Sequence, residues 1–195
     1  MRSRNGFTLV EVLVTLVLIG LLIGVVLPAV VNQLDRGDST RVAADLEAVR
    51  SGSRLFRVDV KRYPATLEQL TEAPGASAAD WDTDTDINGA TISDGLLARW
   101  NGPYIEGSTV STAAGTLETA LGGAVQGTFL DTATLAGTPY LTVMITGLAP
   151  ADIWSIGELI DGDTLSTHDD AGGRIRGSEN GTAADTLYYL ALPVN

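Results

Sequence analysis

The sequence predicts an α+β protein: a long N-terminal helix over about residues 7–61, with an antiparallel sheet packed on its C-terminal half. Three observations support this class. An apolar run from Phe7 to Val31 carries one charged residue, Glu11, and apolar side chains then recur at helical spacing as far as Val60. Strand-like segments follow this helical part. Strands that come after one long helix favour an antiparallel sheet packed on the helix.

The apolar run of residues 7–31 is long enough to cross a membrane, because a bilayer core of roughly 30 Å needs about 20 helical residues. It is too long for a removable secretory signal, and no small-residue cleavage site follows it. Arg2 and Arg4 precede it, so the positive-inside tendency places the N-terminus in the cytoplasm. We therefore expect one inner-membrane segment with the rest of the chain on the outer side.

Four residues within this run are of functional interest. A carboxylate in lipid is costly, so Glu11 is a candidate functional residue, although it could also sit inertly at the membrane interface. Gly20 and Gly24 are spaced i, i+4, which permits close approach of another helix. Pro28 lacks a backbone N–H and crowds the preceding turn, so we expect a kink or local break there.

The helix resumes with one apolar face, which predicts the surface covered by the sheet. Tyr63-Pro64 ends it, because a residue before proline is disfavoured in the α region. The face consists of Val42, Leu46, Val49, Ser53, Phe56 and Val60, and the basic residues outside it are Arg50, Arg54, Arg57 and Lys61.

The remaining elements are shorter. Thr66 is a plausible N-cap for a helix ending near Glu72, and residues 73–95 are loop-like. The β-branched and aromatic content of residues 140–146 and 187–194 predicts strands. The other expected elements are a short helix at 116–121, a helix at 150–160 and a brief strand at 173–176.

Charge is unevenly distributed along the chain. Residues 32–62 hold seven basic and five acidic side chains, whereas residues 63–195 hold three basic and eighteen acidic ones. Such an acidic part disfavours nucleic-acid binding, which needs clustered Lys and Arg. The acidity either provides solubility or lets the basic part of one copy face the acidic part of a neighbour. Cysteine is absent, so packing or a bound ion must stabilise the fold.

An acidic run is a candidate for a loose calcium loop, because carboxylates at alternate positions followed by a glycine suit a hard cation. A solvated acidic loop is the alternative, and an EF-hand proper does not fit, since residue 95 is Gly where the final Glu would stand. The candidate ligands are Asp82, Asp84, Asp86, Asn88 and Asp94.

A second acidic stretch contains Asp161, Asp163 and Asp169, for which a turn-rich loop is the expected structure rather than an ion site. His168 is the single histidine, and one His without Cys cannot form a usual zinc site. Nucleophile-elbow and phosphate-loop motifs are also absent from the sequence. We therefore expect no enzymatic activity.

The first eleven residues, Met1-Arg-Ser-Arg-Asn-Gly6 followed by Phe7-Thr-Leu-Val-Glu11, resemble the class III signal of the type IV pilin and pseudopilin family. The resemblance implies the type IV pilin fold. It also implies that a prepilin peptidase cleaves between Gly6 and Phe7 and N-methylates Phe7. In the family, the carboxylate at the position of Glu11 is thought to pair with the α-amine of a neighbouring subunit. A Gly and a Pro resembling Gly20 and Pro28 bound a segment that can melt in the filaments.

Two further stretches, Arg62–Leu70 and Trp100–Ile105, resemble the major pseudopilins of type II secretion. The implied domains are a leader at 1–6, a transmembrane and polymerisation helix at 7–31, and a stalk helix with a globular part at 32–195. The implied partners are copies of the same chain in a helical filament, the prepilin peptidase and an inner-membrane assembly platform.

These features together predict a structural subunit of a type IV pilus-like or type II secretion pseudopilus filament. It would reside in the inner membrane before assembly and in a periplasmic or cell-surface filament afterwards. One alternative is a minor or tip pilin that binds an adhesion target, a secreted cargo or calcium. Another is a membrane-anchored binding domain that never polymerises, in which case replacing Glu11 would change nothing.

Overall fold

The computed structural model describes residues 8–75, 85–105, 116–119, 121, 123–130, 133–135, 137–162, 173–178 and 185–194. Their contacts divide the chain into two units, residues 1–37 and 38–195, and the second is called the head below. The helices are α1 (Leu9–Val60), α2 (Glu68–Thr71), α3 (Asp94–Leu97) and α4 (Pro150–Asp161). The strands are β1 (Thr116–Glu118), β2 (Ala124–Gln126), β3 (Thr134–Leu135), β4 (Thr138–Leu148), β5 (Ile175–Ser178) and β6 (Asp185–Pro193).

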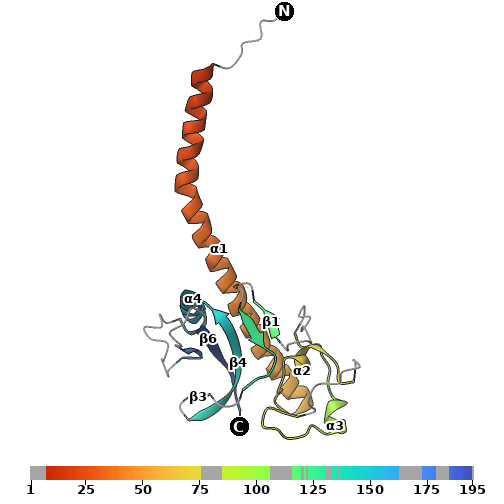
Figure 1. Cartoon of the computed structure of the whole chain (residues 1–195). Helices are drawn as coiled ribbons and strands as arrows, with labels where there is room; N and C mark the ends of the chain where they lie inside the picture. Colours follow the sequence, from red (N-terminus) through yellow and green to blue (C-terminus); the bar gives the residue numbers. More distant parts are fainter. Residues whose placement is uncertain are drawn as a thin grey trace, which may run out of the picture. The chain divides into compact units, whose positions relative to one another are not determined.

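The head contains one antiparallel sheet of order β1-β2-β4-β6-β5, with β3 paired to the other end of β4. β4 and β6 form its centre, with Val143 opposite Tyr189. Both strands lie alongside the second half of α1 (Figure 1). The predicted α+β class, a long N-terminal helix with an antiparallel sheet packed on its C-terminal half, is confirmed.

The apolar face predicted for the second half of α1 is buried in the head. Phe56 and Val60 are completely buried, and Val42 and Leu46 are 1% and 2% exposed. Ser53, the one polar member of the face, is also fully buried. The same core contains Leu141, Ile145, Leu187 and Tyr189 from β4 and β6, together with Ile153 and Ile156 from α4. Helical periodicity therefore identified the side of α1 that the sheet covers.

The C-terminal end of α1 agrees closely with the prediction. The helix ends at Val60, and Lys61 adopts a positive φ of 62° that reverses the chain. Tyr63 is buried, and its hydroxyl donates a hydrogen bond of 2.9 Å to the carbonyl of Pro193. The chain leaving α1 is thereby joined to the end of β6.

Three sequence predictions differ from the structure. Of the kink or local break expected at Pro28, the break is absent, since α1 is helical without interruption from Leu9 to Val60, and the kink stays a prediction. The proline removes one i→i−4 hydrogen bond, and the remaining bonds of this long helix keep it continuous. Residues 116–118 form β1 instead of a helix, because pairing with β2 provides hydrogen bonds that a one-turn helix could not stably maintain. α2 begins at Glu68, and Thr66 Oγ1 accepts only a long hydrogen bond of 3.4 Å, from the N–H of Gln69.

Candidate assembly site

The first unit exposes apolar side chains along the start of α1. Residues Leu9–Leu27 form the one described helix long and apolar enough to cross a membrane, with a mean hydropathy of 2.9. None of this segment is buried against the rest of the described chain, and Leu9 is 81% exposed. Fully exposed apolar surface on this scale is unfavourable in water, so lipid or other helices must cover it.

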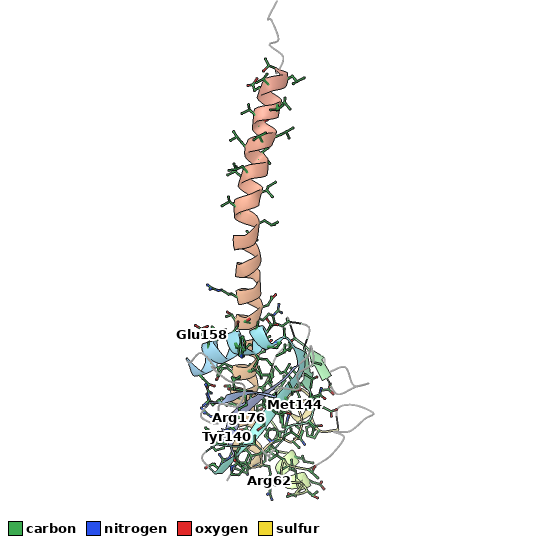
Figure 2. All side chains as sticks on the ribbon, turned by 60° about the vertical axis from the view of Figure 1, so that its left-hand side comes forward. Arg62, Tyr140, Met144, Glu158 and Arg176 are labelled. Carbon is green, nitrogen blue, oxygen red and sulfur yellow. The ribbon has the colours of Figure 1, made fainter. Side chains whose placement is uncertain are left out.

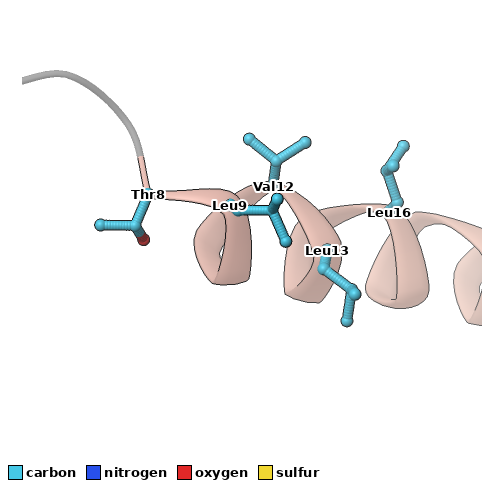
Figure 3. A pocket seen from close by; sticks show the side chains of 5 residues that line it. All are labelled: Thr8, Leu9, Val12, Leu13 and Leu16. Atoms are coloured by element: carbon cyan, nitrogen blue, oxygen red, sulfur yellow. The ribbon is translucent and has the colours of Figure 1, made fainter.

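The N-terminal turn of α1 has a defined cap. Thr8 Oγ1 accepts a hydrogen bond of 3.3 Å from the backbone N–H of Glu11, the arrangement that satisfies a free donor at a helix start. The spacing Thr-x-x-Glu is that of a capping box. Figure 3 shows the open apolar recess beside this turn. Its lining residues are Thr8, Leu9, Val12, Leu13 and Leu16.

Glu11 is exposed in this turn, and no described residue forms a hydrogen bond or ion pair with its carboxylate. Gly20 and Gly24 have a similar property: a Cβ added at either position would meet no atom within 4 Å. The described fold thus requires neither the charge at Glu11 nor the missing side chains at Gly20 and Gly24. Their chemistry is available to a neighbouring molecule.

The two stretches that resemble major pseudopilins, 62–70 and 100–105, come together in the head. Trp100 Nε1 donates a 2.9 Å hydrogen bond to the carbonyl of Gln69, and Tyr104 N donates one of 2.8 Å to the carbonyl of Leu70. Gln69 is fully buried, and its side-chain oxygen accepts a 2.7 Å hydrogen bond from the N–H of Ala65. These contacts join the segment that follows α1 to residues 100–105, about 30 residues further along the chain.

Tyr104 attaches this loop directly to α1. Its ring stacks edge-on against Phe56 with centroids 5.8 Å apart, and its hydroxyl donates a 3.0 Å hydrogen bond to Asp59 Oδ2. Burial, with the hydrogen bond to Asp59, raises the pKa of Tyr104. The loop passes so close that a Cβ on Gly52 would lie 2.8 Å from Ile105 Cγ1 and 3.1 Å from the Tyr104 carbonyl oxygen. Gly52 is therefore required for this contact.

A polar cluster joins the opposite side of α1 to the sheet. Tyr189 Oη on β6 donates a 2.8 Å hydrogen bond to Glu47 Oε1, and Arg174 Nη1 donates to the same oxygen at 3.1 Å. Arg50 Nη1 donates to Glu47 Oε2 at 3.2 Å. Partial burial acts to raise the pKa of Glu47, but the bonds from Tyr189, Arg50 and Arg174 outweigh it and lower that pKa. Burial and the adjacent Glu47 carboxylate raise the pKa of Tyr189.

Arg174 also binds the C-terminal end of α4. Its Nη2 donates a 3.2 Å hydrogen bond to the carbonyl of Ile160, and its Nε lies 3.6 Å from Asp161 Oδ1. Asp161 Oδ2 accepts a 2.9 Å hydrogen bond from the N–H of Ile175. Both carboxylate oxygens of Asp161 are therefore bound within the head. This agrees with the expectation that the acidic stretch has a structural role rather than an ion site. Asp163, His168 and Asp169 lie outside the described residues.

The Glu47 cluster should make the stability of the head depend on pH. A carboxylate whose pKa is lowered by folding stabilises the fold above its unfolded pKa and loses this effect as pH falls through the folded value. We expect wild-type protein in detergent to unfold at higher denaturant than Glu47→Gln at pH 7. This difference should disappear well below pH 4.5, the ordinary pKa of a Glu.

Asp45→Asn is the matched control, because Asp45 is an exposed carboxylate on the same helix. It should show no comparable pH-dependent difference from wild type. A Glu47→Gln variant as stable as wild type at neutral pH would contradict a stabilising role for the cluster.

The predicted calcium ligands are only partly described. Asp86 is 3% exposed, and its Oδ1 accepts hydrogen bonds from the N–H groups of Asn88 and Ala90 at 3.0 and 2.9 Å. Its Oδ2 lies 3.3 Å from Arg62 Nη1. Asp86 therefore closes a tight turn, in which Gly89 has a φ of 75°.

Among the other predicted ligands, Asp94 lies in the first turn of α3, whereas Asp82 and Asp84 lie outside the described residues. No group of three acidic, His or Cys side chains suited to a metal occurs in the part of the chain that the structure describes. The partners of Asp86 favour a structural role for that residue, and calcium binding stays a prediction.

The comparisons with known proteins match these two parts of the chain. The family model for the prokaryotic N-terminal methylation motif matches residues 1–27, and the model for type II secretion system protein G matches residues 29–105. Type II secretion system core protein G of Klebsiella pneumoniae is 34% identical over 79 residues, covering 39% of this chain and 56% of that protein. The Pseudomonas aeruginosa protein of the same description is 28% identical over 108 residues, covering 53% of this chain and 72% of that protein.

A pilus protein matches over a longer region. Fimbrial protein Q of Moraxella bovis is 32% identical over 124 residues, covering 63% of this chain and 71% of that protein. This chain spans about half the length of the two Klebsiella core G proteins, 56% and 49% respectively. No solved structure is significantly similar to the chain.

An exposed apolar helix that continues into the core of an antiparallel sheet domain is the architecture of membrane-anchored filament subunits. The long match to a fimbrial protein and the two family models specify the class further. The chain belongs to the type IV pilin and pseudopilin family.

Proposed function

We propose that this protein is a structural subunit of a pseudopilus or type IV pilus-like filament, polymerised through the first half of α1. The observation that carries the proposal is the apolar surface of Leu9–Leu27, none of which is buried by the described chain. A membrane covers this surface before assembly, and the helices of neighbouring subunits cover it in the filament. The head is then on the outer side of the inner membrane.

Cleavage between Gly6 and Phe7 would create an α-amine on Phe7 close in sequence to Glu11. The two groups would carry opposite charges in a helix bundle of low dielectric, where an unpaired charge is strongly unfavourable. Pairing between the amine of one subunit and Glu11 of the next offsets this cost in a single longitudinal register. The exposure of Glu11 and its lack of a described partner support this role.

The similarity to type II secretion core G proteins favours a secretion pseudopilus over a motility or adhesion pilus. Residues 62–70 and 100–105, which contact each other in the head, both lie within the range 29–105 that the protein G family model matches. The prepilin peptidase and an inner-membrane assembly platform are the partners that this function requires.

Mass measurement of the protein in filaments sheared from cells tests the proposal. We expect a chain beginning at N-methyl-Phe7, present along the whole filament. A chain that keeps residues 1–6 and is found only in membranes would contradict it. A few copies at one filament end would instead indicate a tip subunit.

A Gly6→Val variant should block processing, because a branched side chain would occupy the cleavage position. We expect the six leader residues to remain, by intact mass, and the protein to stay in the membrane fraction without filaments. Asn5→Ala is the matched control and should be processed normally. Normal processing of Gly6→Val would place the cleavage point elsewhere.

A further inference from the structure

The head exposes large apolar side chains at two places. Among its described residues, the exposed large apolar ones are Leu55 and Val58 on α1, at 52% and 57%, and Trp154 and Leu159 on α4, at 46% and 52%. The other large apolar side chains that form the core are buried in the same head. Contiguous exposed apolar patches mark interaction surfaces, and aromatic residues such as Trp are enriched in them.

The pair on α1 lies in a basic setting. Arg54 is exposed four residues before Val58 on the same side of the helix, and Lys61 is exposed directly after the helix ends at Val60. Neither Arg54 nor Lys61 forms an ion pair with any described residue. Leu55, Val58, Arg54 and Lys61 are called the α1 face below.

The pair on α4 lies in an acidic setting. Residues 150–161 contain three acidic side chains and no basic one; Asp161 is paired with Arg174, and Glu158 is the exposed acidic side chain. Ile153 and Ile156 face the core, whereas Trp154, Glu158 and Leu159 are exposed. A surface helix normally exposes polar residues opposite its core side, so exposed Trp and Leu are unusual. Trp154, Glu158 and Leu159 are called the α4 face below.

We propose that the α4 face of one subunit binds the α1 face of a second copy in the assembled filament; this inference rests on the proposed function. The two faces match in charge: each exposes two large apolar side chains, beside Arg54 and Lys61 on the α1 face and beside Glu158 on the α4 face. Charge complementarity of this kind fixes register and excludes wrong contacts. The imbalance between basic residues 32–62 and acidic residues 63–195 favours the same arrangement.

The positions of the faces suit a filament. Figure 2 shows Glu158 of α4 and Arg62, which follows Lys61, at opposite ends of the head. Arg174 binds both Glu47 on α1 and the C-terminal end of α4, so α4 ends close to Glu47. Val58 lies 11 residues further along α1. Two different faces at opposite ends make a head-to-tail contact, which does not close into a dimer and repeats along an open helix.

The contact is separate from assembly through the anchor. α4 lies beyond residues 29–105, the range matched by the protein G family model. The role of the α4 face is to bind one head to the next outside the membrane-derived helix bundle.

Cysteine cross-linking tests the contact directly, because the natural chain has no cysteine. Val58→Cys and Leu159→Cys are introduced together in the full-length protein, and sheared filaments are oxidised and analysed without reductant. We expect a ladder of covalent oligomers, because each copy has one cysteine on each face. A disulfide needs Cβ atoms about 4 Å apart, so a ladder requires direct contact.

Each single-cysteine variant is expected to form no ladder. Val58→Cys with Thr134→Cys is the matched control, because Thr134 is exposed on β3, away from the α4 face. Normal filaments without a ladder from the Val58→Cys, Leu159→Cys variant would overturn the inference and leave the proposed function intact. Adducts with a different protein would also overturn it. Absence of filaments from wild type would overturn the proposed function as well.

Charge reversal gives a second test if the cysteine variant assembles poorly. Glu158→Arg and Lys61→Glu should each reduce the yield of filaments about tenfold or more, since like charges would face each other. Both residues are exposed, so head stability should hardly change. Combining the two reversals restores an opposite-charge pair and should recover most of the yield. Failure of the combined variant to recover would overturn the inference.

Discussion

Replacing Glu11 with Gln is expected to abolish filament assembly while the head stays folded. The described chain gives the carboxylate no partner, so the substitution removes nothing that the fold uses. In a filament it would leave the α-amine of a neighbour unpaired at low dielectric. Removing one member of a buried charge pair costs about 3–5 kcal/mol, which reduces the affinity of each subunit contact about a hundredfold or more.

The measurement is the yield of sheared filaments relative to total membrane protein, with head folding followed by tryptophan fluorescence. Asp45→Asn is the control, since it removes one exposed carboxylate from the same helix within the head. Wild-type filament yield from Glu11→Gln would exclude the pairing role. It would favour a membrane anchor in which Glu11 sits inertly at the interface.

Replacing Phe56 with Ala should destabilise the head by about 3–5 kcal/mol, the usual cost of deleting a buried aromatic side chain. Phe56 is completely buried and stacks against Tyr104. Its loss leaves a cavity where the loop of residues 100–105 meets α1, and Tyr104 loses the ring that positions its bond to Asp59. A change of this size is a large fraction of the stability of a typical domain.

Denaturant unfolding of the full-length protein in detergent measures the effect. Leu55→Ala is the matched control, because Leu55 is adjacent in sequence but 52% exposed. It should change stability by less than about 0.5 kcal/mol, as surface substitutions usually do. Equal destabilisation by the two variants would contradict the assignment of the core side of α1.

The two predictions separate assembly from folding. Glu11→Gln should lose filaments and keep a stable head, whereas Phe56→Ala should lose head stability first. Leu55→Ala should keep the head stable and weaken the proposed contact between the α1 face and the α4 face of a second copy.

Local sequence periodicity identified the features that a single helix carries. The length and composition of residues 7–31, the isolated charge of Glu11 and the buried face from Val42 to Val60 all follow from the side-chain pattern of one continuous helix. The strands β4 and β6 and the helix α4 were predicted for the same reason, because each is long enough to show its own pattern.

The candidate site was predicted in part. Glu11 followed from a lone charge in an apolar run and Gly20 from its i, i+4 spacing to Gly24 and the family resemblance, but the cap provided by Thr8 was missed, although Thr8 and Glu11 have the spacing of a capping box. The α4 face was missed, since sequence alone did not show which side of α4 the core covers.

The sequence by itself determined the anchor, the helix face and the family, because their signals lie within short continuous segments. Only the tertiary structure decided the contacts between distant segments. Glu47 meets Tyr189 across 142 positions, and Arg62 pairs with Asp86 across 24 positions, in a run that the sequence left open between a solvated acidic loop and a calcium loop. Residues 116–118 form a strand because they pair with β2. Such choices depend on which partners the folded chain brings close, and no local pattern contains that information.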